Sequence, residues 1–226
     1  MDELIRIDQQ LLLALNGSDN LFWDHVMCIV TQTTTWIPLA LALCYVMVKN
    51  ANVRKGVLFV LCVAVLIVLT DRISSGLAKP YFQRFRPTHE PALAGLVDVC
   101  DGYVGGLYGF FSSHAANTFG LCTFVSLVLR HWRATFTFIV WACLSSYSRI
   151  YLGLHYPGDI LCGMLFGVLT GGAVYLCYRA LACSGEARKQ YYSSQYTSSG
   201  FLVDDCDVLP ATFAATLVVV AICSLW

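Results

Sequence analysis

The chain has 226 residues, of which 58% are hydrophobic and only 12% are charged, and its formal net charge is zero. A mean hydropathy of +0.66 is too high for an ordinary soluble domain and indicates a protein embedded in a bilayer. The balanced charge, without any basic run, argues against nucleic acid or an acidic polymer as a partner.

The first predicted element is an N-terminal helix, within residues 1–20, that lies in the membrane interface. Apolar residues from Leu4 to Leu15 recur on one helical face, and Asp8 lies off that face. No basic segment precedes this helix and no small-residue cleavage pattern follows it, so we do not interpret it as a signal peptide.

Six apolar runs follow and predict an all-α fold, an integral-membrane bundle of about six transmembrane helices. A rise of 1.5 Å per residue requires about 20 residues to cross the hydrocarbon core, so the third, fourth and sixth runs need flanking residues. The polar patch Thr31–Thr35 inside the first run is interpreted as threonines that bond back to a continuous helix. The runs are residues 22–48, 53–70, 113–129, 135–147, 159–181 and 209–226.

Two longer connections separate these runs within a single membrane-embedded domain, residues 1–226. Residues 78–112 hold prolines, glycines and several aromatics, which predicts an ordered extracytoplasmic loop over the site. Residues 183–208 are rich in serine, tyrosine and acidic residues, which predicts a mobile cytoplasmic connector.

Small residues within the runs are interpreted as packing residues. Most of the eleven cysteines lie in apolar segments, where a thiol acts as a small hydrophobe, and no Cys/His spacing suggests a metal site or a disulfide framework. The fifth run carries Gly163, Gly167, Gly171 and Gly172 at helical spacing, which should permit close helix contact.

The stretch SRIYLGLHYPGD, which joins the fourth run to the fifth, carries three chemically active side chains. Pro157 suits the first turn of a helix, so His155 should precede a helix N-terminus and Asp159 should lie one turn inside. A carboxylate that accepts the Nδ1 hydrogen leaves Nε2 free to attack, while Arg149 offers donors to a phosphate. Phosphoryl transfer to histidine fits this pattern; a structural Arg149–Asp159 ion pair is the alternative.

Two further segments carry polar residues of the same kind. KPYFQRFRP contains Lys79 and Arg86, and FSSHAAN contains Ser112, Ser113 and His114 at the start of the third run. Either serine is a natural N-cap, and a helix N-terminus is a ready anion site. Together with Arg149, the two cations could neutralise a phosphate without a metal.

The order KxxxxxxRP, a short serine-histidine motif, then SRxxxxxHxxxD resembles the type 2 phosphatidic acid phosphatase (PAP2) superfamily, whose site is shared with bacterial acid phosphatases and vanadium haloperoxidases. The first and third motifs match fully. In the middle motif, usually PSGH, Phe111 and Ser113 stand where proline and glycine are common. The resemblance covers about Lys79 to Asp159.

The resemblance implies an integral-membrane lipid phosphatase that needs neither metal nor cofactor. His155 would be the nucleophile that forms a phosphohistidine, Asp159 its orienting partner and His114 the general acid. The expected substrate-binding residues are Lys79, Arg86, Arg149, Ser112 and Ser113.

The substrate expected from the resemblance is a membrane lipid phosphate or diphosphate, which loses its terminal phosphate. Undecaprenyl diphosphate and lipid A phosphate are favoured, and phosphatidylglycerol phosphate is a third candidate. Two other functions remain open, namely a lipid phosphotransferase with the same site and a non-catalytic lipid-phosphate binder or transporter. Retention of His155, His114 and Asp159 argues against the non-catalytic function.

Basic residues predict the orientation in the inner (plasma) membrane. With six spans, eight basic residues fall on the side opposite the site and six on the site side, or three when the motif residues are left out. The positive-inside rule therefore directs the site toward the periplasm or cell exterior. The eight are Lys49, Arg54, Lys55, Arg130, Arg133, Arg179, Arg188 and Lys189, and the six are Arg6, Arg72, Arg84, Lys79, Arg86 and Arg149.

Overall fold

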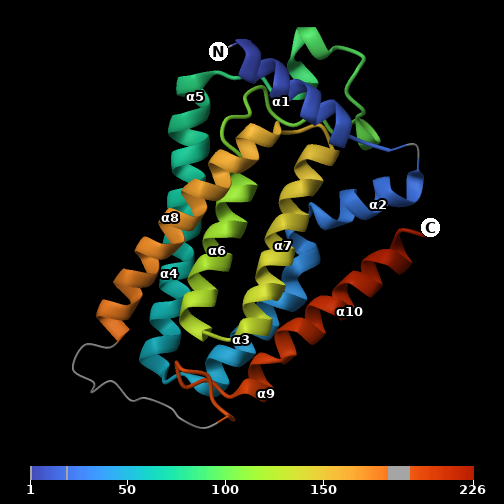
Figure 1. The fold of residues 1–226 in the computed structure, drawn as a ribbon. Helices are drawn as coiled ribbons and strands as arrows, with labels where there is room; N and C mark the ends of the chain where they lie inside the picture. The colour runs from blue at the N-terminus through green and yellow to red at the C-terminus, as the bar shows by residue number, and fades with distance from the viewer. Residues whose placement is uncertain (1, 19, 183–193) are drawn as a thin grey trace.

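The computed structural model describes residues 2–18, 20–182 and 194–226, and within these residues the regular structure is helical. Helices α4, α6, α7 and α8 run between two ends of a bundle, and α1 crosses one of these ends (Figure 1). The helices are α1 (Asp2–Leu15), α2 (Leu21–Val30), α3 (Ile37–Asn50), α4 (Val53–Asp71), α5 (Lys79–Phe82), α6 (Ser113–Leu129), α7 (Trp132–Tyr151), α8 (Pro157–Ala182), α9 (Val203–Cys206) and α10 (Val208–Cys223).

The closest helix pair is α6 with α8, and glycines make this contact. A Cβ atom added to Gly163, Gly167 or Gly171 would lie 2.5, 2.3 or 2.4 Å from a backbone carbonyl oxygen of α6 or of its cap. Such distances exclude any side chain, so these three glycines permit the close approach. The prediction for Gly172 is wrong, since a Cβ there would meet nothing within 4 Å.

The second apolar run continues much further than expected. Helix α4 passes through a π-helical segment, η2 (Arg72–Ala78), into α5, so that the apolar helix extends from Val53 to Phe82. Residues 78–82, expected in the loop, are therefore helical. Pro80 has no N–H to donate to the preceding turn, and the wider π turn accommodates that gap without ending the helix.

The first apolar run is not one continuous helix. Helices α2 and α3 are bent by 70° at a break that contains the short 3₁₀ segment η1 (Thr33–Trp36). Thr35 Oγ1 donates to the carbonyl of Ile29 at 2.6 Å, and Trp36 Nε1 donates to that of Val30 at 2.9 Å. These side chains satisfy carbonyls at the end of α2. The patch Thr31–Thr35 therefore lies at the end of a helix, and the expectation that it lies inside a continuous helix is wrong.

Three helices in the described part of the chain are long and apolar enough to cross a membrane, and a fourth span results if the bent α2–α3 pair is counted as one. They are residues 53–82, 157–182 and 203–223. Helix α6 is apolar but shorter, and α7 begins and ends beyond the predicted 135–147. The count of about six spans remains a prediction.

Helix α1 rests on the end of the bundle through a small apolar contact. Leu12 is fully buried in a cluster with Leu93, Ile150, Tyr156 and others, whereas most apolar side chains of α1 are exposed. The interfacial position of this helix remains a prediction.

The connector before α10 is partly ordered. Tyr196 pairs with Leu202 in an isolated bridge, and the N–H of Leu202 donates to Asn50 Oδ1 at 2.8 Å. Asn50 in turn donates to Asp205 at 3.0 Å. The connector is therefore hydrogen-bonded to α3 from Leu202 onward; the mobility expected for residues 183–208 remains a prediction, and residues 183–193 lie outside the described part.

Candidate active site

His155 and Asp159 lie where α7 ends and α8 begins, at the end of the bundle crossed by α1. His155 is 2% exposed, and Asp159, one turn into α8, is fully buried. His155 Nδ1 is 3.4 Å from Asp159 Oδ2, somewhat longer than an ordinary N–H···O bond, and the same oxygen accepts from the N–H of Tyr156 at 3.2 Å. Catalytic hydrogen bonds often shorten only when substrate is bound.

The surroundings of His155 disfavour its protonated form. Burial is the main cause, followed by the positive charges of Arg86, Arg149 and Lys79, and together they hold the pKa of His155 well below its usual range. The imidazole is therefore neutral at pH 7, which is the form that can act as a nucleophile.

Lys79 is held by hydroxyl groups of two helices. Its Nζ donates to Ser113 Oγ at 2.9 Å and to Ser75 Oγ at 3.2 Å, and Ser113 Oγ also contacts Ser74 Oγ at 2.9 Å. The π-helical segment supplies Ser74 and Ser75 for this cluster. An ammonium group has three donors, so one remains for a ligand.

The two arginines are fixed by oxygen atoms from different elements. Arg86 is 9% exposed and its Nε donates to the carbonyl of Tyr108 at 3.2 Å. Arg149 is 5% exposed, its Nη1 donates to Thr31 Oγ1 at 2.8 Å, and its buried Nε has no protein partner. A buried guanidinium with an unpaired donor suits an anionic ligand.

The start of α6 brings the middle motif to the same place. Ser112 is the N-cap: its Oγ accepts from the N–H of Ala115 at 3.4 Å, and its N–H donates to the carbonyl of Asp159 at 3.1 Å. His114, in the first turn, interacts electrostatically with His155 and with Arg149. All the predicted site residues therefore gather at one end of the bundle.

Gly109, in the loop before α6, packs against this cluster. Phe85 pairs with Tyr108 in an isolated antiparallel bridge, and the N–H of Gly109 donates to the carbonyl of Arg84 at 2.9 Å. A Cβ atom on Gly109 would lie 3.1 Å from Asp159 Oδ2. A side chain at this position would crowd the carboxylate.

The sequence did not indicate several residues that contact the cluster. Thr31, which holds Arg149, was interpreted as bonding back to its own helix. Arg84 lies inside the first motif and pairs with Asp159 at 2.7 Å, and Asp8 of α1 pairs with Arg84 at 2.7 Å. The only signal was that Asp8 is polar and that Arg84 precedes Arg86 by two residues.

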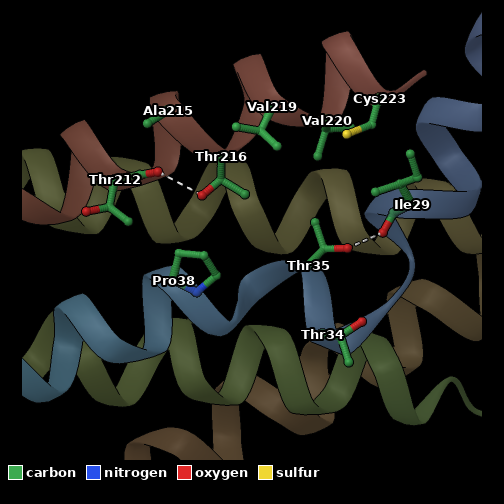
Figure 2. Close-up of a pocket in the computed structure, with 10 residues that line it drawn as sticks. All are labelled: Ile29, Thr34, Thr35, Pro38, Thr212, Ala215, Thr216, Val219, Val220 and Cys223. Atoms are coloured by element: carbon green, nitrogen blue, oxygen red, sulfur yellow. Dashed lines mark hydrogen bonds between the residues drawn. The ribbon is translucent and has the colours of Figure 1, made fainter. Parts of the chain in front are cut away.

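A groove of about 370 Å³ lies away from this cluster, between α10 and the α2–α3 bend (Figure 2). None of the predicted site residues lines it. The lining residues are Ile29, Thr34, Thr35, Pro38, Thr212, Ala215, Thr216, Val219, Val220 and Cys223.

Metal-type ligands also gather elsewhere in the described residues. Asp24, Asp98 and Cys100 place their ligand atoms within 4.8 Å of one another, and none of the three belongs to a motif. Asp24 already accepts from the Tyr151 hydroxyl at 2.6 Å. Among the predicted site residues, Asp159 is the one carboxylate.

A neutral buried histidine beside a carboxylate, with three cations and a second histidine, has the features of a phosphoryl-transfer site, and here it lies at the end of an apolar helical bundle. A family model described as the PAP2 superfamily matches residues 55–183. The chain belongs to this superfamily, in its branch of membrane lipid phosphatases.

Two curated relatives are both described as lipid A 4'-phosphatase. The protein from Bacteroides thetaiotaomicron is 38% identical over 171 residues, which are 75% of this chain and 76% of the relative. The protein from Porphyromonas gingivalis is 32% identical over 180 residues, which are 79% of this chain and 75% of the relative. No solved structure matches this chain.

Proposed function

We propose that this protein removes a phosphate from lipid A, with the 4'-phosphate as its leading target, through a phosphohistidine on His155. The observation that carries the proposal is the buried imidazole of His155, which is kept neutral and lies among Lys79, Arg86 and Arg149. The description of both relatives as lipid A 4'-phosphatases supports lipid A as the substrate.

In the proposed first step, His155 Nε2 attacks the phosphorus atom and the bond from phosphorus to the lipid oxygen breaks. Negative charge on the bound phosphate offsets the cations around His114 and favours its protonated form, and His114 gives that proton to the lipid oxygen, so the lipid leaves as an alcohol. Water then attacks the phosphohistidine, His114 takes the proton, and inorganic phosphate is released. Asp159 orients His155 in both steps, while Lys79 and the two arginines stabilise the charge on the phosphoryl oxygens.

The substrate is expected to enter from the membrane. The site lies at the helix ends, so acyl chains can stay in the bilayer while the phosphate meets the cations. Each buried methylene contributes about 0.8 kcal/mol, so a long-chain lipid reaches far higher local occupancy than a soluble ester. Soluble phosphates lack this anchor.

Metal independence is part of the proposal. The site supplies three cations for the phosphate, and Asp159, the one carboxylate among the predicted site residues, is already paired with Arg84 and accepts from the N–H of Tyr156. Mg²⁺ sites usually combine one or two carboxylates with substrate phosphates and several waters, and Asp159 is the one carboxylate among the predicted site residues. Chelators should therefore leave phosphate release intact, and strict Mg²⁺ dependence in defined detergent would contradict this.

The deciding experiment is phosphate release by purified protein from a matched panel of substrates. The panel contains lipid A, undecaprenyl diphosphate, phosphatidylglycerol phosphate and glucose phosphate, and mass spectrometry of the lipid A product identifies which phosphate is lost. We expect lipid A to be the best substrate and to lose its 4'-phosphate. Equal cleavage of glucose phosphate would overturn the assignment to a lipid.

A second measurement tests the nucleophile. Wild-type protein incubated with lipid A that carries a radioactive phosphate should gain an acid-labile, base-stable label, and His155→Ala should lose both label and turnover. His89→Ala removes a loop histidine outside the motifs and is the matched control. Full activity in His155→Ala would refute the phosphohistidine.

A further inference from the structure

Arg84 bridges two carboxylates that come from opposite parts of the chain. Its Nη1 donates to Asp159 Oδ1 at 2.7 Å and its Nη2 donates to Asp8 Oδ2 at 2.7 Å. The guanidinium also lies over the Tyr156 ring, 4.1 Å from its centroid. Two charged hydrogen bonds and a stacked ring leave this side chain little freedom.

Asp8 connects helix α1 to the start of α8 by a second bond. Its Oδ1 accepts from the N–H of Gly158 at 2.8 Å, while its Oδ2 accepts from Arg84. A Cβ atom on Gly158 would lie 2.7 Å from Asp8 Oδ2, so a side chain there would displace the Asp8 carboxylate from this position. The first turn of α8, which carries Asp159, is thus held from α1 both directly and through Arg84.

We propose that Arg84 and Asp8 are positioning residues for the reaction, and that helix α1 is part of the support of the active site. They fix the Asp159 carboxylate, which in turn orients the imidazole of His155. The inference rests on the proposed function, because it gives Asp159 and His155 their roles in phosphoryl transfer.

The charges explain why such a support is needed. The Asp159 side chain is 0% exposed, and a buried carboxylate is costly unless hydrogen bonds and an opposite charge compensate it. Burial opposes the charge of Arg84, but Asp159 and Asp8 outweigh this effect and raise the pKa of Arg84. Oδ1 of Asp159 is thereby occupied by Arg84, which leaves Oδ2 facing His155 Nδ1.

The kinetic test separates kcat from KM in four variants. Arg84→Gln and Asp8→Asn should lower kcat by about tenfold to 100-fold, because a small misplacement of a reacting group costs this much. KM should change by less than about twofold, since neither residue touches the phosphate. Arg84→Lys keeps the charge and should recover part of the loss, and Glu3→Gln removes an exposed carboxylate of α1 and should change nothing.

A binding test works without any lipid substrate. Calorimetry measures the affinity of each purified variant for vanadate, which resembles pentacoordinate phosphorus, and for inorganic phosphate, which resembles the ground state. If Arg84 and Asp8 position His155, both variants should lose vanadate affinity while phosphate affinity stays at the wild-type value. The double variant should lose no more than Arg84→Gln alone, because the two residues act through one contact chain.

The outcomes distinguish this inference from the proposed function. Failure of wild type to release phosphate from any lipid would overturn the proposed function, and the vanadate comparison would still decide the positioning roles. Unchanged kcat and vanadate affinity in Arg84→Gln would overturn the inference. A parallel loss of vanadate and phosphate affinity, or a wild type that binds no vanadate, would overturn it as well.

Discussion

At the scale of single residues, Ser113 shows how this chain differs from the usual pattern of its superfamily. It stands where glycine is common, and its hydroxyl accepts from Lys79 at 2.9 Å while also contacting two serines of the π-helical segment. Phe111, which replaces the usual proline, is buried against Ala78, Ala116 and Phe166. The substitutions thus contribute to holding Lys79 and to packing the start of α6.

Ser113→Gly should weaken substrate binding more than it slows chemistry. Lys79 then loses one of two hydroxyl acceptors, and we expect KM to rise by about tenfold to 100-fold, since hydrogen bonds to charged groups contribute on the order of 1.5–3 kcal/mol. Ser113→Ala removes the same hydroxyl while keeping a Cβ, and its KM should rise by a similar factor. Steady-state kinetics on lipid A would check this, and a kcat/KM above wild type in both variants would contradict it.

The low pKa of His155 sets the expected pH dependence. An imidazole whose pKa lies below its ordinary value of 6.5 stays neutral in mildly acidic solution and is protonated only at still lower pH. The acid limb of kcat/KM should therefore lie below pH 6.5. In Arg86→Gln a nearby positive charge is lost, which raises the pKa of His155 and moves the limb upward.

The pH profiles of kcat/KM for wild type and Arg86→Gln, measured on the same lipid, check the sign of this shift. The ionisation of the substrate is common to the two profiles, so it cannot account for a difference between them. A limb that stays in place or moves to lower pH in Arg86→Gln would contradict the assignment of the limb to His155.

At the scale of elements, the pairing of α6 and α8 fixes the distance between the middle and last motifs. Three glycines of α8 face backbone atoms of α6, and the N–H of Ser112 donates to the carbonyl of Asp159 at 3.1 Å. The N-cap of one helix is thus bonded to the first turn of the other. Without the close glycine contact, the N-cap of α6 and the backbone carbonyl of Asp159 could not share this bond.

Gly167→Ala should destabilise the bundle, whereas Gly172→Ala should not. The added Cβ at Gly167 would be 2.3 Å from the carbonyl oxygen of Ala116, so the helices must separate, at a cost of about 1–3 kcal/mol. Alanine at Gly172 meets nothing within 4 Å and gains up to about 1 kcal/mol of helix propensity. The free energy of unfolding of both variants, measured in the same detergent, checks this prediction. Equal values for Gly167→Ala and Gly172→Ala would contradict it.

Motif spacing and hydrophobic runs predicted the superfamily, the helical fold and the extent of α6, because these depend on residues near one another in sequence. The break at Thr31 was missed, because threonines that bond to carbonyls look the same within a helix and at its end. The contact of Arg84 with Asp8 joins residues 76 positions apart, and no local pattern specifies such a partner. Long-range contacts of this kind complete the site.

At the scale of the whole molecule, the predicted site lies at one end and most of the basic residues that set the predicted orientation lie at the other. The ends of α3 and α8, like the connection from α6 to α7, are opposite the end crossed by α1 (Figure 1). Arg188 and Lys189 fall outside the described residues. The orientation with the site outside the cytoplasm stays a prediction. A labelling experiment that tests it needs cysteines at positions that the structure shows to be accessible.

Cys100, the one cysteine of residues 78–112, is unsuitable as such a label. Its side chain is 7% exposed, and burial, aided by Asp24, raises the pKa of its thiol to about 12, so little reactive thiolate exists at pH 7. Cys206 is 0% exposed and Cys183 lies outside the described residues.

Introduced cysteines test the orientation instead. Leu96, in the loop at the site end, is 62% exposed, and Val53, at the other end, is 84% exposed. In intact cells a membrane-impermeant thiol reagent should label Leu96→Cys above the level of the parent protein and should leave Val53→Cys at that level. The reverse pattern would invert the orientation.

The π-helical segment also bears on how the length of this chain can vary. The seven residues of η2 wind more widely than an α-helix, so the segment accommodates an extra residue between Thr70 and Lys79. Deleting one residue there would restore α-helical winding and leave Lys79 facing about the same direction, toward Ser113, because the seven residues of this wider winding turn about as far as six α-helical residues. A chain that lacks one residue of Arg72–Ala78 should therefore still place its lysine in this way through a continuous α-helix, as long as the hydroxyls of Ser74 and Ser75 are kept.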